Sequence, residues 1–349
     1  MILRLLALAL LTAPALADTP FDWGFSEGLT PVRTGREASG ADCIGCHEDQ
    51  AERWQHSRHR AAHDNPIYQS GLVDEPSPFC VHCHAPLPEQ SAEVLANLRH
   101  YVARDPSRGL QPRPRLPEPL AAEGVNCVAC HVRDGQILAT NADTAEWAPH
   151  GITATPALSD GSLCEGCHDF HMPIFEGGSW ILTDEIMQGT TSEWRAWRAA
   201  GGTERCVDCH MPAGDHAFRG AYDLDFVRGA VAVTRDGRTL TLTSTGVGHA
   251  LPTGDLFRNL TVDARVDGRW STVHRIGRTF EEVQDPLTLA WSKHEVADTS
   301  LQPGEPRAVA LPESAARWRI RMHYGSDADE HRERLTDAEL YADLWQGEL

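Results

Sequence analysis

Lysine is almost absent from the sequence, and cysteine is absent outside one short repeated motif. The 349 residues contain a single lysine, Lys293, and the excess of acidic over basic residues gives a formal net charge of −19. An acidic protein of this kind has little attraction for nucleic acid or anionic lipid, and it favours partners with basic docking faces. Beyond the amino-terminal segment, no apolar run is long enough to span a bilayer, so we expect no integral membrane segment.

The first seventeen residues have the pattern of a cleaved export signal. Arg4 precedes an apolar run over residues 5–11, and the segment ends in Ala15-Leu16-Ala17, a small-x-small cleavage pattern. We therefore expect a signal peptide over residues 1–17, a mature chain beginning at Asp18, and a periplasmic location. The residue directly after the cleavage site is Asp18 and not cysteine, which argues against a lipid anchor there.

All ten cysteines lie in five copies of the motif C-x-x-C-H, which attaches c-type haem. The two thiols add to the vinyl groups of the porphyrin, and the following histidine reaches the iron from the same side. We therefore predict five covalently attached haems. The predicted cofactor-binding residues are Cys43, Cys46, Cys80, Cys83, Cys127, Cys130, Cys164, Cys167, Cys206 and Cys209. The predicted proximal iron ligands are His47, His84, His131, His168 and His210.

Other uses of these cysteines do not fit their number or spacing. A disulfide scaffold does not need a histidine after every second cysteine. Zinc ribbons pair two C-x-x-C units around one metal, so five units leave one over. Thioredoxin-like chemistry needs one exposed C-x-x-C on a βαβ frame, not five in series.

Two regions of the chain follow different patterns. Residues 18–222 contain every motif, with steps of 37, 47, 37 and 42 residues between first cysteines. These steps are too short for conventional apolar cores, so we expect a pentahaem cytochrome c domain in which short helices and loops surround the porphyrins. Helices are predicted over residues 48–63 and 192–200.

Residues 223–349 show the two-residue periodicity of β-strands. Apolar side chains alternate over residues 230–242, again over 260–266, and near the end over 318–324. We expect a small all-β, sandwich-like domain. Its last segment contains a capping-box pattern beginning at Thr336, which predicts a final helix bearing Leu340, Leu344 and Trp345.

The second axial position of each iron can hold a ligand or stay open. A ligand there sets the reduction potential of the iron, and an open position allows a substrate to bind. We predict distal ligands from five histidines outside the motifs. His59 follows the first motif on a helix that projects it toward a neighbouring haem, and His216 follows the last motif. His150 comes after a proline between the third and fourth motifs, and His249 lies in a glycine-rich turn. His171 is too close to His168 to reach around the same haem, but it could serve another.

Several other side chains are weaker candidates for ligation. His56 and His63 share a helical face with His59, and one of them could also bind iron. Met172, Met187 and Met211 could be axial ligands, but packing beside porphyrin is the preferred interpretation.

Five segments resemble the wider family of the tetrahaem electron acceptor of hydroxylamine oxidoreductase. They are WQHSRHRAA at 54–62, EGVNCVACH at 123–131, CHMP at 209–212, DHAFRG at 215–220 and GHALPTG at 248–254. The last is similar to a G-H-x-x-P-T-G element that opens the β-domain of larger members. The resemblance covers residues 40–325 and implies closely stacked haems and electron transfer, without specifying a substrate. Pentahaem nitrite reductases are related but use lysine in place of one motif histidine. All five motifs here end in histidine, which argues against that activity.

We therefore expect a periplasmic electron carrier that passes single electrons between redox partner proteins through stacked, mostly bis-histidine haems. The alternative is an oxidoreductase that acts on a small nitrogen or sulfur compound at one five-coordinate haem. Such an enzyme would need an open iron face beside a proton donor. The multihaem fold hosts both roles and does not decide between them.

Overall fold

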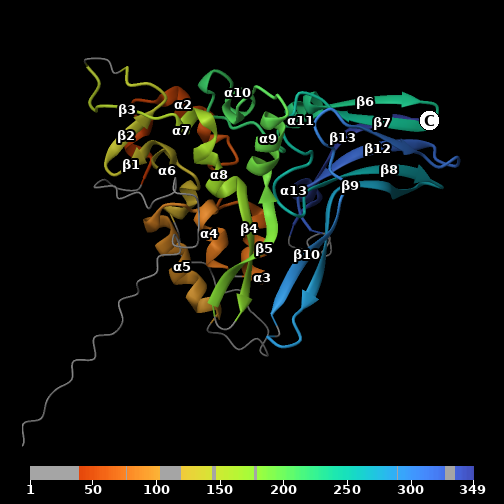
Figure 1. The fold of residues 1–349 in the computed structure, drawn as a ribbon, viewed down its shortest axis with the longest axis horizontal. Helices are drawn as coiled ribbons and strands as arrows, with labels where there is room; N and C mark the ends of the chain where they lie inside the picture. Colours follow the sequence, from red (N-terminus) through yellow and green to blue (C-terminus); the bar gives the residue numbers. More distant parts are fainter. Residues whose placement is uncertain are drawn as a thin grey trace, which may run out of the picture.

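The computed structural model describes residues 39–75, 77–102, 119–143, 147–176, 179–288, 290–326 and 335–349 (Figure 1). The expected signal peptide over residues 1–17 lies outside these ranges. Within them, no helix combines the length and apolar character needed to cross a membrane.

Short helices dominate the region of the five motifs (Figure 1). They are α1 (Ala41–Ile44), α2 (Glu48–Gln55), α3 (Pro66–Asp74), α4 (Pro78–His84), α5 (Pro88–Val102), α6 (Cys127–His131), α7 (Ala157–Asp160), α8 (Ser162–His168), α9 (Thr190–Ala199) and α10 (Cys206–His210). The helix predicted over residues 192–200 corresponds to α9.

Four of the motifs form the last turns of helices, namely α4, α6, α8 and α10. Side chains three and four residues apart share one face of a helix, so this geometry directs both thiols and the imidazole to the same side. Side-chain caps begin two of these helices: Ser77 accepts from the amide of Phe79, and Asn126 accepts from that of Ala129.

The helix after the first motif is shorter than predicted. α2 ends at Gln55, and residues 56–64 form turns in place of the expected continuation. In this segment the carbonyl of His59 accepts from the amide of Val125 at 2.9 Å. Gly124, with φ of +59°, permits the approach because a Cβ there would collide with the His59 carbonyl. The His59 carbonyl also accepts a local hydrogen bond from the amide of Ala62 at 3.2 Å, so one local and one tertiary bond hold His59 in place.

Two small sheets complete this region. The strands β1 (Val132–Arg133), β2 (Gln136–Ala139) and β3 (Thr153–Ala154) form one sheet, and β4 (Asp169–Glu176) and β5 (Ser179–Gly189) form an antiparallel hairpin.

After α11 (Leu224–Ala230) the chain forms two antiparallel sheets, with strand orders β10-β9-β8-β12-β13 and β11-β7-β6. The strands are β6 (Val231–Asp236), β7 (Thr239–Ser244), β8 (Asn259–Val266), β9 (Arg269–Gln284), β10 (Trp291–Asp298), β11 (Pro306–Ala310), β12 (Arg317–His323) and β13 (Tyr341–Glu348). Leu240 and Leu242 of β7 pack into one fully buried core with Leu260 of β8, Ile276 of β9 and Ile320 of β12. The two sheets thus face each other, as the alternating pattern predicted.

The predicted C-terminal helix is wrong beyond its first turn. The capping box at Thr336 and Glu339 is present, but α13 covers only Asp337–Leu340. β13 follows at once and pairs with β12, and its Leu344 is buried in the core. Backbone pairing along the edge of β12 therefore outweighs the local helix signal.

The β4–β5 hairpin lies beside the β9–β10 hairpin of the larger sheet (Figure 1). Nδ1 of His294 in β10 lies 2.9 Å from Oε1 of Glu185 in β5. The guanidinium of Arg278 in β9 donates to the carbonyl of Met187 at 2.8 Å. These bonds join the region of the motifs to the β-sheets.

Candidate haem-binding cavity

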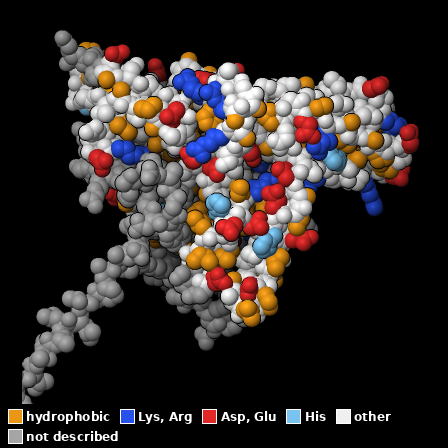
Figure 2. Space-filling model, in the orientation of Figure 1, with side chains coloured by type: hydrophobic (Ala, Val, Ile, Leu, Met, Phe, Trp, Pro, Cys, Tyr) orange, Lys and Arg blue, Asp and Glu red, His pale blue; other side chains and the backbone are white. Residues whose placement is uncertain are grey.

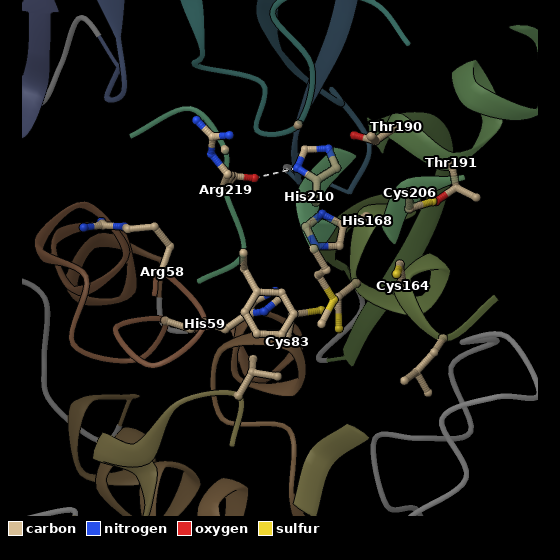
Figure 3. Close-up of a pocket in the computed structure, with 18 of the residues that line it drawn as sticks. Arg58, His59, Cys83, Cys164, His168, Thr190, Thr191, Cys206, His210 and Arg219 are labelled. Carbon is tan, nitrogen blue, oxygen red and sulfur yellow. Dashed lines mark hydrogen bonds between the residues drawn. The ribbon is translucent and has the colours of Figure 1, made fainter. Parts of the chain in front are cut away.

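All ten motif cysteines and all five motif histidines line one continuous cavity of about 3300 Å³. An ordinary ligand pocket holds about 300–1,000 Å³, so this space can take several large cofactors. Figure 3 shows His59, His168 and His210 directed into it from different elements. No group of three metal-binding side chains in the described part of the chain could hold a bare metal ion.

Four of the five predicted distal histidines face a motif histidine across this cavity. The ring centres are 6.3 Å apart for His47 and His150, 6.3 Å for His168 and His59, 6.1 Å for His131 and His216, and 6.2 Å for His210 and His249. With metal–imidazole bonds of about 2 Å, two rings on opposite sides of one iron have centres about 6 Å apart. The spacing in every pair therefore fits one iron between two imidazoles.

Backbone carbonyls orient the imidazoles that line the cavity. The contacts from Nδ1 are His84 to Ala62 (2.7 Å), His131 to Leu138 (2.8 Å), His210 to Arg219 (2.5 Å, dashed in Figure 3), His216 to Gly214 (2.8 Å) and His249 to Ala250 (2.8 Å). A proton held on Nδ1 leaves the lone pair of Nε2 free to bind metal.

Burial also keeps the central imidazoles neutral. It lowers the pKa of His59 to about 3, with smaller contributions from His168 and His210. Burial likewise lowers the pKa of His168 and of His249 to about 4. Iron binds the neutral form of imidazole, so these rings are ready for ligation at neutral pH.

Other lining residues fit porphyrins as well. Three large apolar side chains are exposed although they line the cavity: Trp147 at 84%, Phe175 at 54% and Trp291 at 58%. A bound porphyrin face would cover such surfaces. In the same cavity the buried Nε of Arg258 has no hydrogen-bond partner among the described residues. An arginine in this position suits a haem propionate.

Several motifs lie close to one another in space. The Sγ of Cys127 lies beside Gly40, just before the first motif, and the Sγ of Cys206 lies beside Gly161, just before the fourth. The Sγ of Cys83 lies 4.0 Å from the carbonyl oxygen of Gly166 in the fourth motif. The third and fourth motifs are also close, because Cys167 contributes, after burial, to raising the pKa of Cys130 to about 11. The motifs therefore follow the order first, third, fourth and fifth, and the second branches from the fourth.

His171 does not join the paired histidines. Its side chain is exposed on β4 and does not line the cavity. Pairing between β4 and β5 directs the neighbouring Met172 inward instead. His84 differs from the other motif histidines, because no described histidine ring faces it across the cavity. The ring of Tyr68 stacks on His84 at 3.9 Å and 4°.

Glu193 of α9 holds the loop that carries His249. Its Oε2 accepts hydrogen bonds from the amide of Ala250 at 3.0 Å and from the hydroxyl of Thr253 at 2.8 Å. Burial raises the pKa of this carboxyl group. Gly248 is required here, since a Cβ would lie 2.8 Å from the ring of Trp197. A side chain from the motif region thus positions a histidine of the β-region.

Sequence reasoning did not identify Tyr68, Glu193 or Arg258. Tyr68 and Glu193 lie in ordinary helical patterns, and Arg258 is one of thirty arginines, so only tertiary contacts distinguish them. The position of Glu193, thirteen residues before the fifth motif, gives no signal of its contact with residues 250–253.

No protein-family model matches the sequence, and no curated protein sequence matches it. Among solved structures, the chain is similar to the crystal structure of a penta-heme cytochrome c552 from Thermochromatium tepidum. The TM-score is 0.59 at 20% identity, and the match covers 88% of this chain and 97% of that one. This likeness extends over both regions of the chain, and it shows that the protein has the fold of a multihaem c-type cytochrome.

Proposed function

We propose that the protein is a periplasmic pentahaem c-type cytochrome that transfers single electrons between redox partner proteins. Four pairs of facing histidine rings, with centres 6.1–6.3 Å apart, are the observation that supports this most directly. Iron held by two imidazoles has no position for a substrate and exchanges electrons without making or breaking bonds.

The ligand set follows from these pairs. His47 and His150 would hold the first haem, His131 and His216 the third, His168 and His59 the fourth, and His210 and His249 the fifth. His84 would hold the second haem from one side. The thiols of each motif would fix each porphyrin covalently, and Nδ1 contacts to carbonyls would keep the rings in place while the iron changes charge.

The closeness of the motifs supports a continuous route for electrons. A thioether sulfur is joined to its porphyrin ring through a single carbon, so motifs that lie close together would bring two porphyrin edges close together. The route would run from the first haem through the third and fourth to the fifth, with the second as a branch.

Partners are expected to bind through charge. Excess acidic side chains favour a donor or acceptor with a basic docking face, and association should weaken as salt increases. On the face shown in Figure 2, acidic and basic side chains are interspersed, and apolar side chains gather where the β4–β5 and β9–β10 hairpins end.

A reductive titration followed by optical and electron paramagnetic resonance spectra tests this function. We expect five electrons to be taken up per chain and four irons to give low-spin signals of bis-imidazole haem. The reduced protein should then pass its electrons to a basic cytochrome at a rate that falls with ionic strength. Mostly high-spin irons, or no exchange with any protein acceptor, would overturn the proposal.

A further inference from the structure

We propose that the haem on Cys80 and Cys83 binds a small neutral molecule at its iron, opposite His84. This haem would thereby differ from the other four, which the proposed pairs of histidines would close. The inference rests on the proposed function, since it assumes a haem attached to this motif.

Among the described histidines, those that line the cavity are His84 and the eight members of the four pairs. His63 is buried and adds to the lowering of the pKa of His84 by burial, but it does not line the cavity, and its ring packs against Tyr68 at 5.7 Å. His171 is exposed on β4. His294 contacts Glu185 through Nδ1 and Ser292 through Nε2, both at 2.9 Å.

Apolar side chains line the cavity near this motif. Phe79 of α4 packs against Phe170 of β4 with ring centres 5.2 Å apart. Leu72 of α3 and Met172 of β4 are buried and line the same cavity. Phe175 and Trp291, at the ends of the two hairpins, are exposed apolar groups on its wall. Such walls favour a small ligand of low polarity.

The charges near the second motif argue against an anionic ligand. Glu75, Asp255 and Glu282 line the cavity together with Cys80 and His84. Lys293 also lines the cavity, and its Nζ lies 4.0 Å from Glu75 and 3.9 Å from Glu282. The surroundings are therefore negative on balance, so a neutral molecule is favoured over an anion.

The second motif also occupies the end of a branch. Its Cys83 Sγ lies 4.0 Å from the carbonyl oxygen of Gly166 in the fourth motif. A molecule bound there would sit beside the electron route without interrupting it.

Tyr68 provides a way to identify the haem, because it stacks on His84 and on no other motif histidine of the described chain. The matched control is Phe226, which contacts His210 edge-on with ring centres 5.4 Å apart. Each aromatic ring touches the proximal imidazole of a different haem.

The experiment uses the full-length reduced protein with carbon monoxide as the probe. We expect one carbon monoxide bound per chain. Resonance Raman spectra without the gas should show one iron–histidine stretching band, which arises only from five-coordinate ferrous haem. Tyr68→Ala should shift this band, Tyr68→Phe should leave it in place, and Phe226→Ala should also leave it in place.

Three results would overturn the inference. Five low-spin haems and no bound carbon monoxide would show that the iron is closed, and a new carbon monoxide site in Met172→Ala would identify methionine as its ligand. A band that responds to Phe226→Ala and not to Tyr68→Ala would assign the open iron to another haem. Failure of the proposed function looks different, because peptide mass analysis would then find Cys80 and Cys83 without haem.

Discussion

The contact between Glu193 and the His249 loop allows a quantitative test of how the two regions are joined. Glu193→Ala removes an oxygen that accepts from both Ala250 and Thr253. A hydrogen bond to a charged group contributes about 1.5–3 kcal/mol. Since both bonds use one oxygen and are not additive, we expect a loss of about 3 kcal/mol in the free energy of opening this loop.

Amide hydrogen exchange measures that opening directly. Because about 1.4 kcal/mol corresponds to a factor of ten, the amide of Ala250 should exchange about 100-fold faster in Glu193→Ala. Part of one haem should become high spin as His249 leaves it. Glu193→Gln is the matched control, since its carbonyl oxygen can accept both bonds, and its exchange should rise less than about 10-fold.

The same residue predicts a dependence on pH. Burial raises the pKa of Glu193 above its ordinary value of 4.5, so the folded chain binds this proton more tightly than the unfolded chain does. The resulting stabilisation is full below pH 4.5 and is lost as pH rises through the folded-state pKa. Glu193→Gln should remove this part of the pH dependence. In the exchange experiment, an unchanged rate at the amide of Ala250 in Glu193→Ala would refute the role of Glu193 in holding this loop.

Three further predictions follow from the site and the core. His59→Ala should convert one haem from low to high spin with the haem number unchanged, because thioethers hold the porphyrin, whereas His171→Ala should leave the spectrum as it is. His249→Ala should make one haem high spin and speed proteolysis between the two regions, and an unchanged spectrum would remove it as a ligand. Asp263→Ala should lower the stability of the β-sheets to urea by about 3 kcal/mol, because it breaks a buried ion pair. The exposed Asp225→Ala should change it by less than about 0.5 kcal/mol.

Much of the candidate site could be predicted because covalent chemistry specifies it locally. A C-x-x-C-H segment needs only one helical turn to present its three groups, so the motif residues were clear without any tertiary information. The alternation around Leu240 and Leu260 similarly predicted two packed sheets, because a strand buries one face at every second residue. The glycine-rich turn around His249 indicated a ligand in the sequence. Only the structure shows that Glu193 of α9 holds this turn in place.

The remaining features depend on contacts between distant residues. His171 and Met172 are adjacent on β4, and only pairing with β5 decides which of them faces the cavity. The position of His59 in the turns after α2 depends on a hydrogen bond from Val125, which is 66 positions away in the sequence. The segment after Leu340 forms β13 in place of the predicted helix because it pairs with β12. Local helix propensity carries no information about that pairing. The pairing of four motif histidines with their partners also required three-dimensional positions.

The central claim is that this chain carries five covalently attached haems. Intact mass spectrometry of the exported, acid-denatured protein tests it most directly, because acid releases axial ligands but leaves thioether bonds intact. The mass should exceed that of the mature polypeptide by five haems, one for each C-x-x-C-H motif. A fully matured sample with four haems or fewer would contradict the account.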